Sequence, residues 1–174
     1  MPLYTLPAAD EYALYYGKYI DRVGPDPLAA LVAQAASTAA LLAATPESLA
    51  SHRYAEGKWT VREVVVHLSD AERVFAYRAL RVGRGDGTPL PGFDENLFAA
   101  NCGAERRTLA DVAAEFAAVR AASLALFRSF DAEAIGRRGT ASGHPVTVRS
   151  LVAMIAGHEL HHVALLRERY GLGG

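Results

Sequence analysis

The sequence predicts an all-α protein in which four amphipathic helices pack as a four-helix bundle. Four long segments carry apolar residues at steps of three and four, which is the spacing of one face of a helix. No segment alternates apolar and polar residues over a length that would form a sheet, and the chain contains no internal repeat. Helices of this kind bury their apolar faces against one another, and a bundle is the simplest arrangement that does so.

The first two predicted helices are defined by their termini. An alanine-rich segment, residues 28–44, follows an Asp-Pro pair that forms an N-cap with proline at the first helical position, and a Thr-Pro pair ends it. The second helix begins at Thr60, where Glu63 three residues later completes a capping box. It ends in the glycine cluster at 83–87, where glycine favours a turn.

The last two predicted helices are separated from the others by longer connections. The connection at 83–107 contains a short helix over 95–100, and its apolar residues indicate that it packs down on the bundle. The third helix begins at Thr108, and the fourth runs from Val148 to Arg169 and stops at Gly171. Between them, residues 136–147 are predicted as a turn-rich connection without strands.

Composition indicates one ordinary globular domain, with a tyrosine-rich N-terminal arm at residues 1–24 and the bundle at residues 25–170. The chain has 174 residues and a net charge of −1, and its 18 basic residues form no run that would favour nucleic acid. The single Cys102 excludes an internal disulfide. No signal peptide and no stretch of 18 apolar residues is evident, so we expect a cytoplasmic protein with no membrane span.

Three histidines carry the strongest functional signal. His158 and His162 are four residues apart, and both lie on the apolar face of the last predicted helix. A buried imidazole needs a hydrogen-bond partner or a metal, because burying an unsatisfied polar group is costly. His67 lies beside the apolar face of the second helix. We therefore expect these three side chains to converge on a metal ion.

Alternatives to this metal site remain open from the residues alone. A lone H-x-x-x-H pair also occurs on surfaces or in cores where histidines bond to backbone, and His161 is an alternative ligand although it lies off the apolar face. His52 and His144 fall in predicted loops, where we expect them to be solvated. The order H-E-L-H-H around Glu159 is not the H-E-x-x-H of metalloproteases. Three neutral imidazoles suit zinc or nickel, and they leave a coordination position for water or substrate.

Candidates for contact with a substrate are Asp70, Arg78 and Asp94. Asp70 lies one helical turn from the predicted ligand on its own helix, where it would orient the imidazole or contact substrate. The alternative is a helix-surface carboxylate paired with Arg73 or Arg62.

The chain resembles the DinB/YfiT-like metalloprotein superfamily in three motifs, which follow one another in the family's order and spacing. They are W-T-V-R-E-V-V-V-H-L-S-D-A-E-R-V-F-A-Y-R at 59–78, P-L-P-G-F-D at 89–94 and G-H-E-L-H-H at 157–162. The resemblance covers most of residues 25–170 and implies a four-helix bundle with up-down-down-up topology. It also implies one divalent metal held by three histidines, which map onto His67, His158 and His162.

The resemblance implies several reactions. Functions in the family include thiol S-transfer with low-molecular-weight thiols such as bacillithiol or mycothiol, related isomerisations, and hydrolysis. Some members carry a His-His pair in the second helix, whereas Val66 precedes His67 here, so the motifs do not define the subgroup or the substrate.

Two functional hypotheses follow. The leading one is a metal-dependent enzyme, a thiol S-transferase or hydrolase, that acts on a small molecule with zinc or nickel and with a low-molecular-weight thiol as co-substrate in the transferase case. The other is a non-catalytic stress-response binding module whose metal is structural or absent. Members of the family often dimerise, and the tyrosine-rich arm and alanine-rich helix offer apolar faces for a homodimer.

Overall fold

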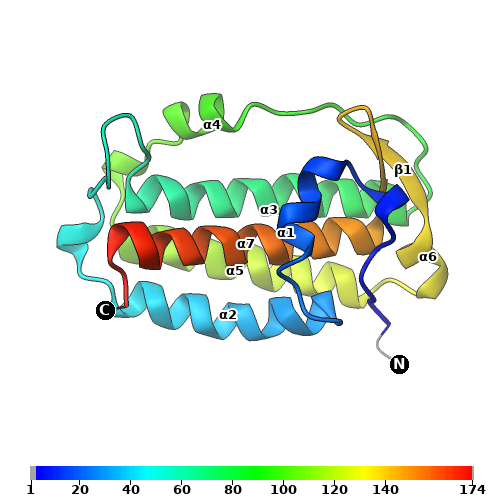
Figure 1. The fold of residues 1–174 in the computed structure, drawn as a ribbon, viewed down its shortest axis with the longest axis horizontal. Helices are drawn as coiled ribbons and strands as arrows, with labels where there is room; N and C mark the ends of the chain where they lie inside the picture. Colours follow the sequence, from blue (N-terminus) through cyan, green and yellow to red (C-terminus); the bar gives the residue numbers. More distant parts are fainter. Residues whose placement is uncertain (1–2, 174) are drawn as a thin grey trace.

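The computed structural model describes residues 3–173 and contains the predicted bundle. Its four long helices are α2 (Pro27–Ala44), α3 (Val61–Gly83), α5 (Leu109–Arg128) and α7 (Val148–Tyr170). In Figure 1, α3 and α5 run in one direction while α2 and α7 run in the other. The topology is therefore up-down-down-up, and the all-α bundle prediction is confirmed.

Short elements fill the connections between these helices. The N-terminal arm contains two short turns, Ala9–Glu11 and Leu14–Tyr16, followed by α1 (Gly17–Ile20), and it lies against the bundle (Figure 1). The crossover from α3 to α5 contains α4 (Glu95–Asn101), close to the predicted short helix. Single turns at Glu47–Leu49 and Ala104–Arg106 and the short α6 (Ala132–Gly136) complete the helical elements of the described residues.

Local chemistry explains why the long helices begin and end where they do. The Thr60 side chain accepts a hydrogen bond from the Glu63 backbone N–H at 3.2 Å, and the Glu63 carboxylate accepts one from the Thr60 N–H at 2.6 Å. These bonds complete the predicted capping box and satisfy donors that the first turn leaves free. At the C-terminus of α7, Gly171 ends the helix with a φ of 73°, a left-handed conformation that glycine adopts without strain.

The prediction that residues 136–147 contain no strand is wrong. Strands β1 (Arg138–Ala141) and β2 (His144–Thr147) form an antiparallel hairpin, so His144 lies in a strand and not in a loop, although it is exposed. The two turn residues, Ser142 and Gly143, have φ values of 51° and 77°. A Ser-Gly pair in this conformation matches the twist of two flanking strands, but four-residue strands are too short to show alternation.

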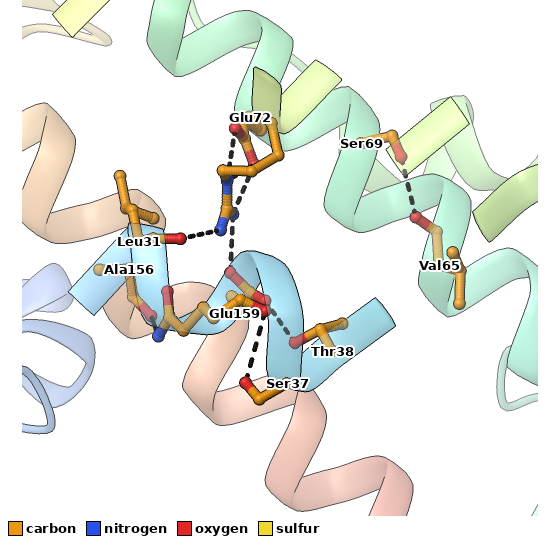
Figure 2. Close-up of polar contacts among 10 residues, drawn as sticks. Leu31, Ser37, Thr38, Val65, Ser69, Glu72, Ala156 and Glu159 are labelled. Carbon is orange, nitrogen blue, oxygen red and sulfur yellow. Dashed lines mark hydrogen bonds and ion pairs between the residues drawn. The ribbon is translucent and has the colours of Figure 1, made fainter. Parts of the chain in front are cut away.

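A buried charge network links all four long helices. The Arg120 guanidinium of α5 donates to both oxygens of Glu72 on α3, at 2.9 and 2.7 Å, and to Glu159 on α7 at 2.6 Å. It also donates to the Leu31 carbonyl of α2 at 3.1 Å, and Glu159 accepts a hydrogen bond from Thr38 of α2 at 2.6 Å (Figure 2). The three charged side chains are almost fully buried, so this network fixes how the helices face one another.

The exposed side of α2 is unusually apolar for a surface. Within the described residues, α2 is the one helix long and apolar enough to cross a membrane by length and composition, with a mean hydropathy of 1.6. A bundle helix packed on one face passes the same test, and Leu31, Gln34 and Thr38 of α2 are buried in the bundle.

Candidate metal centre

The three predicted histidines meet between α3 and α7. These helices pack side by side and run in opposite directions (Figure 1). The packing brings His67 of α3 close to His158 and His162 of α7. One ligand atom from each of the three residues lies within 4.8 Å of the others. His67 and His162 are each 8% exposed, and His158 is partly buried.

The geometry of the rings is compact. Ring centroids are 4.8 Å apart for His67 and His158, 4.9 Å for His67 and His162, and 4.5 Å for His158 and His162. The Nε2 atoms of His67 and His158 are 3.0 Å apart. Two nitrogens bound to one zinc ion at about 2.0–2.1 Å are separated by roughly 3 Å, so this spacing fits two ligands of one ion.

Burial keeps all three imidazoles neutral at physiological pH. It lowers the pKa of His67 to about 4 and, with His67 and His161 nearby, lowers the pKa of His162 to about 3. Burial and the adjacent imidazoles hold the pKa of His158 well below its usual value. A neutral imidazole is the form that binds a metal ion.

One buried atom tests whether these residues fit a metal. His162 Nδ1 is buried and has no hydrogen-bond partner among the described residues. A buried, unsatisfied ring nitrogen is costly unless something binds it, such as an ordered water or an ion. The donor set is three imidazoles without a carboxylate or thiolate, which suits zinc or nickel and not calcium or magnesium.

A cavity of about 190 Å³ lies beside the three histidines. Its wall is largely aromatic, with Tyr15, Tyr16, Tyr19, Trp59, Phe75 and Phe93. The Trp59 ring lies 4.6 Å from the His67 ring and is tilted against it. Glu95, Ser142 and His161 supply the polar groups. The site therefore has room for a small molecule next to the imidazoles.

The remaining candidates from the sequence lie outside the cavity lining. Asp70 pairs with Arg73 at 3.3 Å on the helix surface, the alternative that the sequence left open. Asp94 is the N-cap of α4, where its carboxylate accepts hydrogen bonds from two backbone N–H groups at 2.9 and 3.0 Å. Arg78 is buried, and its Nη2 donates to the Pro91 carbonyl at 2.7 Å and to the Ser142 hydroxyl at 3.0 Å. Arg78 thus ties the crossover to the hairpin behind the cavity.

The other histidines are also accounted for. His161 lies in the cavity wall, with its ring centroid 5.3 Å from that of Tyr19, and it is absent from the convergent set of three. His52 and His144 are both exposed, as expected. Glu159, between the two histidines of α7, belongs to the charge network and not to the cavity.

Sequence reasoning missed most of the cavity wall. The tyrosines of the arm, Trp59 and Phe93 come from three separate segments, and their meeting depends on how the arm and the crossover dock on the bundle. A signal was available only for Trp59, which directly precedes the capping box of α3 and is therefore held near the first turns of that helix.

The fold and the site together define a four-helix bundle protein with three convergent histidines on its second and last long helices. The chain belongs to the DinB superfamily, whose family model matches residues 30–166. The solved structure of YfiT from Bacillus subtilis, described as a probable metal-dependent hydrolase with an unusual four-helix bundle topology, is similar with a TM-score of 0.70. The two sequences are 18% identical, and the match covers 96% of this chain and 94% of YfiT, so the likeness is one of fold. No curated protein sequence matches the chain.

Proposed function

We propose that this protein is a metal-dependent enzyme, a hydrolase or a thiol S-transferase, that acts on a small molecule. His67, His158 and His162 are the proposed ligands of one zinc or nickel ion. The observation that carries the proposal is the convergence of three neutral imidazoles beside an aromatic cavity. Membership of the DinB superfamily and the description of YfiT as a probable metal-dependent hydrolase support it.

Each residue has a role in this proposal. When bound, a divalent ion supplies Lewis-acid chemistry that brings the pKa of a coordinated water or thiol toward neutrality. The three imidazoles hold the ion, and Trp59 restricts the position of the His67 ring. The aromatic rings line the cavity beside the imidazoles, and His161 in that wall is the proposed group that accepts or gives a proton.

The two reactions differ in the nucleophile. In hydrolysis, the water oxygen forms a bond to the acyl carbon, the bond to the leaving group breaks, and the leaving group takes the proton. In thiol transfer, the thiol sulfur forms a C–S bond with the electrophilic carbon of the substrate, and the thiol proton is released. The leaving group departs from that carbon with its electron pair. A low-molecular-weight thiol is then the co-substrate, and it must reach the metal through the cavity.

Metal content tests the site first. Protein purified without added metal should contain about one zinc or nickel ion per chain by elemental analysis, because three imidazoles form one site. His67→Ala and His162→Ala should each lose the ion. His52→Ala is the matched control, because His52 is exposed and is neither one of the three convergent histidines nor part of the cavity wall, and it should keep the ion. Unchanged occupancy in both ligand variants would show that the assignment is wrong.

Activity then separates an enzyme from the alternative, a non-catalytic module with a structural metal. The metal-loaded protein should hydrolyse an activated ester, or transfer a thiol such as cysteine to 1-chloro-2,4-dinitrobenzene, and His162→Ala should lose either activity. The cavity beside the imidazoles favours the enzyme, because structural metal sites are closed. Metal binding without either activity across a range of acyl and electrophilic substrates would favour the module.

A further inference from the structure

The N-terminal arm forms one wall of the cavity. Tyr15, Tyr16 and Tyr19 all line it, and they come from a segment that precedes the bundle in the sequence. The helix of the arm, α1, packs against α7, the helix that carries two of the three histidines (Figure 1). The arm is therefore placed to determine which molecules reach the imidazoles.

A single glycine permits this close packing. The carbonyl group of Tyr19 lies directly over Gly157, the residue before His158, and a Cβ atom on Gly157 would overlap the Tyr19 carbonyl oxygen and carbon. The obstacle is backbone, so it cannot move aside as the end of a flexible side chain would. Gly157 has ordinary helical geometry, and its lack of a side chain is needed only for the approach of the arm.

The docked tyrosines contact both the histidines and one another. The Tyr19 ring meets the His158 and His161 rings edge to face, at centroid distances of 5.5 and 5.3 Å. Tyr16 meets Phe75 of α3 edge to face at 6.0 Å, and Tyr15 lies 5.3 Å from Tyr16. Together these rings line one side of the cavity, and aromatic rings contact a flat apolar or aromatic body favourably.

We propose that the tyrosine arm is the specificity-determining wall of the site, that it selects small molecules with a flat apolar or aromatic body, and that Gly157 is the positioning residue that lets the arm dock. The proposal rests on the metal site proposed above. It adds the class of ligand and the part of the chain that recognises it.

The test compares two ligands that bind a metal through the same ring. The protein is loaded with Co²⁺, and imidazole and 4-phenylimidazole are titrated separately while visible absorption is recorded. Both bind through an imidazole nitrogen, and only the second carries a ring that reaches the wall. One aromatic contact corresponds to a factor of about 2–10, so the 4-phenylimidazole should bind more tightly than imidazole by that factor.

Gly157→Ala should weaken this preference. The affinity ratio of the two ligands should fall, because the tyrosines leave the wall while Trp59, Phe75 and Phe93 remain, and the variant should still bind Co²⁺ and imidazole. Gly136→Ala is the matched control, because a Cβ at Gly136 meets nothing within 4 Å, and it should keep the preference. Hydrogen exchange in residues 13–23 should become faster in Gly157→Ala and stay unchanged in Gly136→Ala.

A second variant acts on the wall itself. Tyr15→Ala should also lower the ratio, and it is expected to fold because Tyr15 is 59% exposed. Leu14→Ala is its control, since Leu14 is the adjacent residue of the arm, is 85% exposed and does not line the cavity. An unchanged ratio in both Gly157→Ala and Tyr15→Ala, with imidazole still bound, would overturn the proposal.

The same experiment separates this proposal from the proposed function. If imidazole binds neither the unmodified protein nor any variant, the proposed metal site with an open position is wrong. The proposed role of the arm in ligand selection is then wrong as well. If imidazole binds throughout and only the ratio fails to respond, the metal site stands and the arm is not its specificity wall. Unchanged exchange in Gly157→Ala would show that Gly157 does not position the arm.

Discussion

The buried charge network makes Arg120→Met one of the most informative substitutions for stability. Arg120 is 2% exposed and forms ion pairs with both Glu72 and Glu159. Methionine keeps a long flexible side chain but removes the charge and every donor. Two carboxylates then face each other in the core without a compensating cation.

The size of the expected loss in the free energy of unfolding depends on which charged partner is removed. Breaking a buried ion pair from one side costs about 3–5 kcal/mol, because the remaining charge is buried without compensation. Whole domains are stable by roughly 5–15 kcal/mol, so Arg120→Met should remove a large part of the free energy of unfolding. The triple variant Arg120→Met, Glu72→Leu and Glu159→Leu removes all the charges together and should recover most of the loss, since replacing a complete buried set by apolar residues is often neutral.

Urea unfolding measures both effects. The midpoint should fall for Arg120→Met while the dependence on urea stays constant, which shows that stability changed and not the surface exposed on unfolding. Arg73→Met is the control, because Arg73 is half-exposed and pairs with Glu115 at 2.6 Å on the surface, where a pair is worth about 0–1 kcal/mol. Equal losses in the two variants would refute the reasoning that the network is desolvated.

Four further outcomes are expected. Burial alone would raise the pKa of Glu11, but hydrogen bonds from Arg149 and Thr147 outweigh burial and lower the pKa overall. The stability that Glu11 contributes is therefore present above its unfolded pKa of about 4.3. It is lost as pH falls through the lower pKa of the folded state. Urea unfolding in an acidic pH series should show that loss, and Glu11→Gln should lack it. Arg78→Met removes the bonds from Nη2 to the crossover and to the hairpin turn, so hydrogen exchange at residues 90–93 should become faster. A chelator should lower the melting temperature of the metal-loaded protein, because an ion that binds only the folded state stabilises it, and a protein that melts identically with and without chelator would contradict the site. Light scattering at micromolar concentration tests the homodimer predicted from the family, and a monomer would exclude it.

The helices were predictable because their signals are local. A capping box at Thr60, a proline at the start of α2 and a glycine after α7 each act within one turn, so the sequence defines these ends without reference to the rest of the fold. The hairpin at 138–147 was missed because its strands are four residues long, and the isolated bridge from Leu90 to Ala141 that joins it to the crossover follows from no local pattern.

The residues of the candidate site also fall into those whose position follows from local sequence and those whose position does not. His158 and His162 share a helix face by spacing alone, and His67 lies next to the apolar face of its own helix, so their convergence could be predicted. The tyrosine wall could not, because it depends on contact between Tyr19 and Gly157, which are far apart in the sequence. Glu72 and Arg120 were also missed, since each gains its partner only after the helices pack.

Glu159 lies between two proposed ligands, and this position predicts that the charge network affects the proposed metal centre. Successive side chains on a helix point about 100° apart, so Glu159 faces the bundle interior while His158 and His162 face α3 and the cavity. Its bonds to Arg120 and Thr38 therefore fix the rotation of α7 about its own axis. A small rotation would move both imidazoles relative to His67.

Glu159→Ala should consequently weaken metal binding, although the Glu159 side chain bonds only to the charge network and to none of the proposed ligands. Residues that act on a site through packing alone typically change its affinity by about 0.5–2 kcal/mol. Competition with a chromophoric chelator measures the affinity for Zn²⁺ at a temperature where urea unfolding shows the variant to be folded. Glu168→Ala is the matched control, because Glu168 lies on the same helix and is exposed. If both variants bind Zn²⁺ as the unmodified protein does, the network stabilises the bundle without orienting the imidazoles, and the core and the proposed metal centre are not coupled.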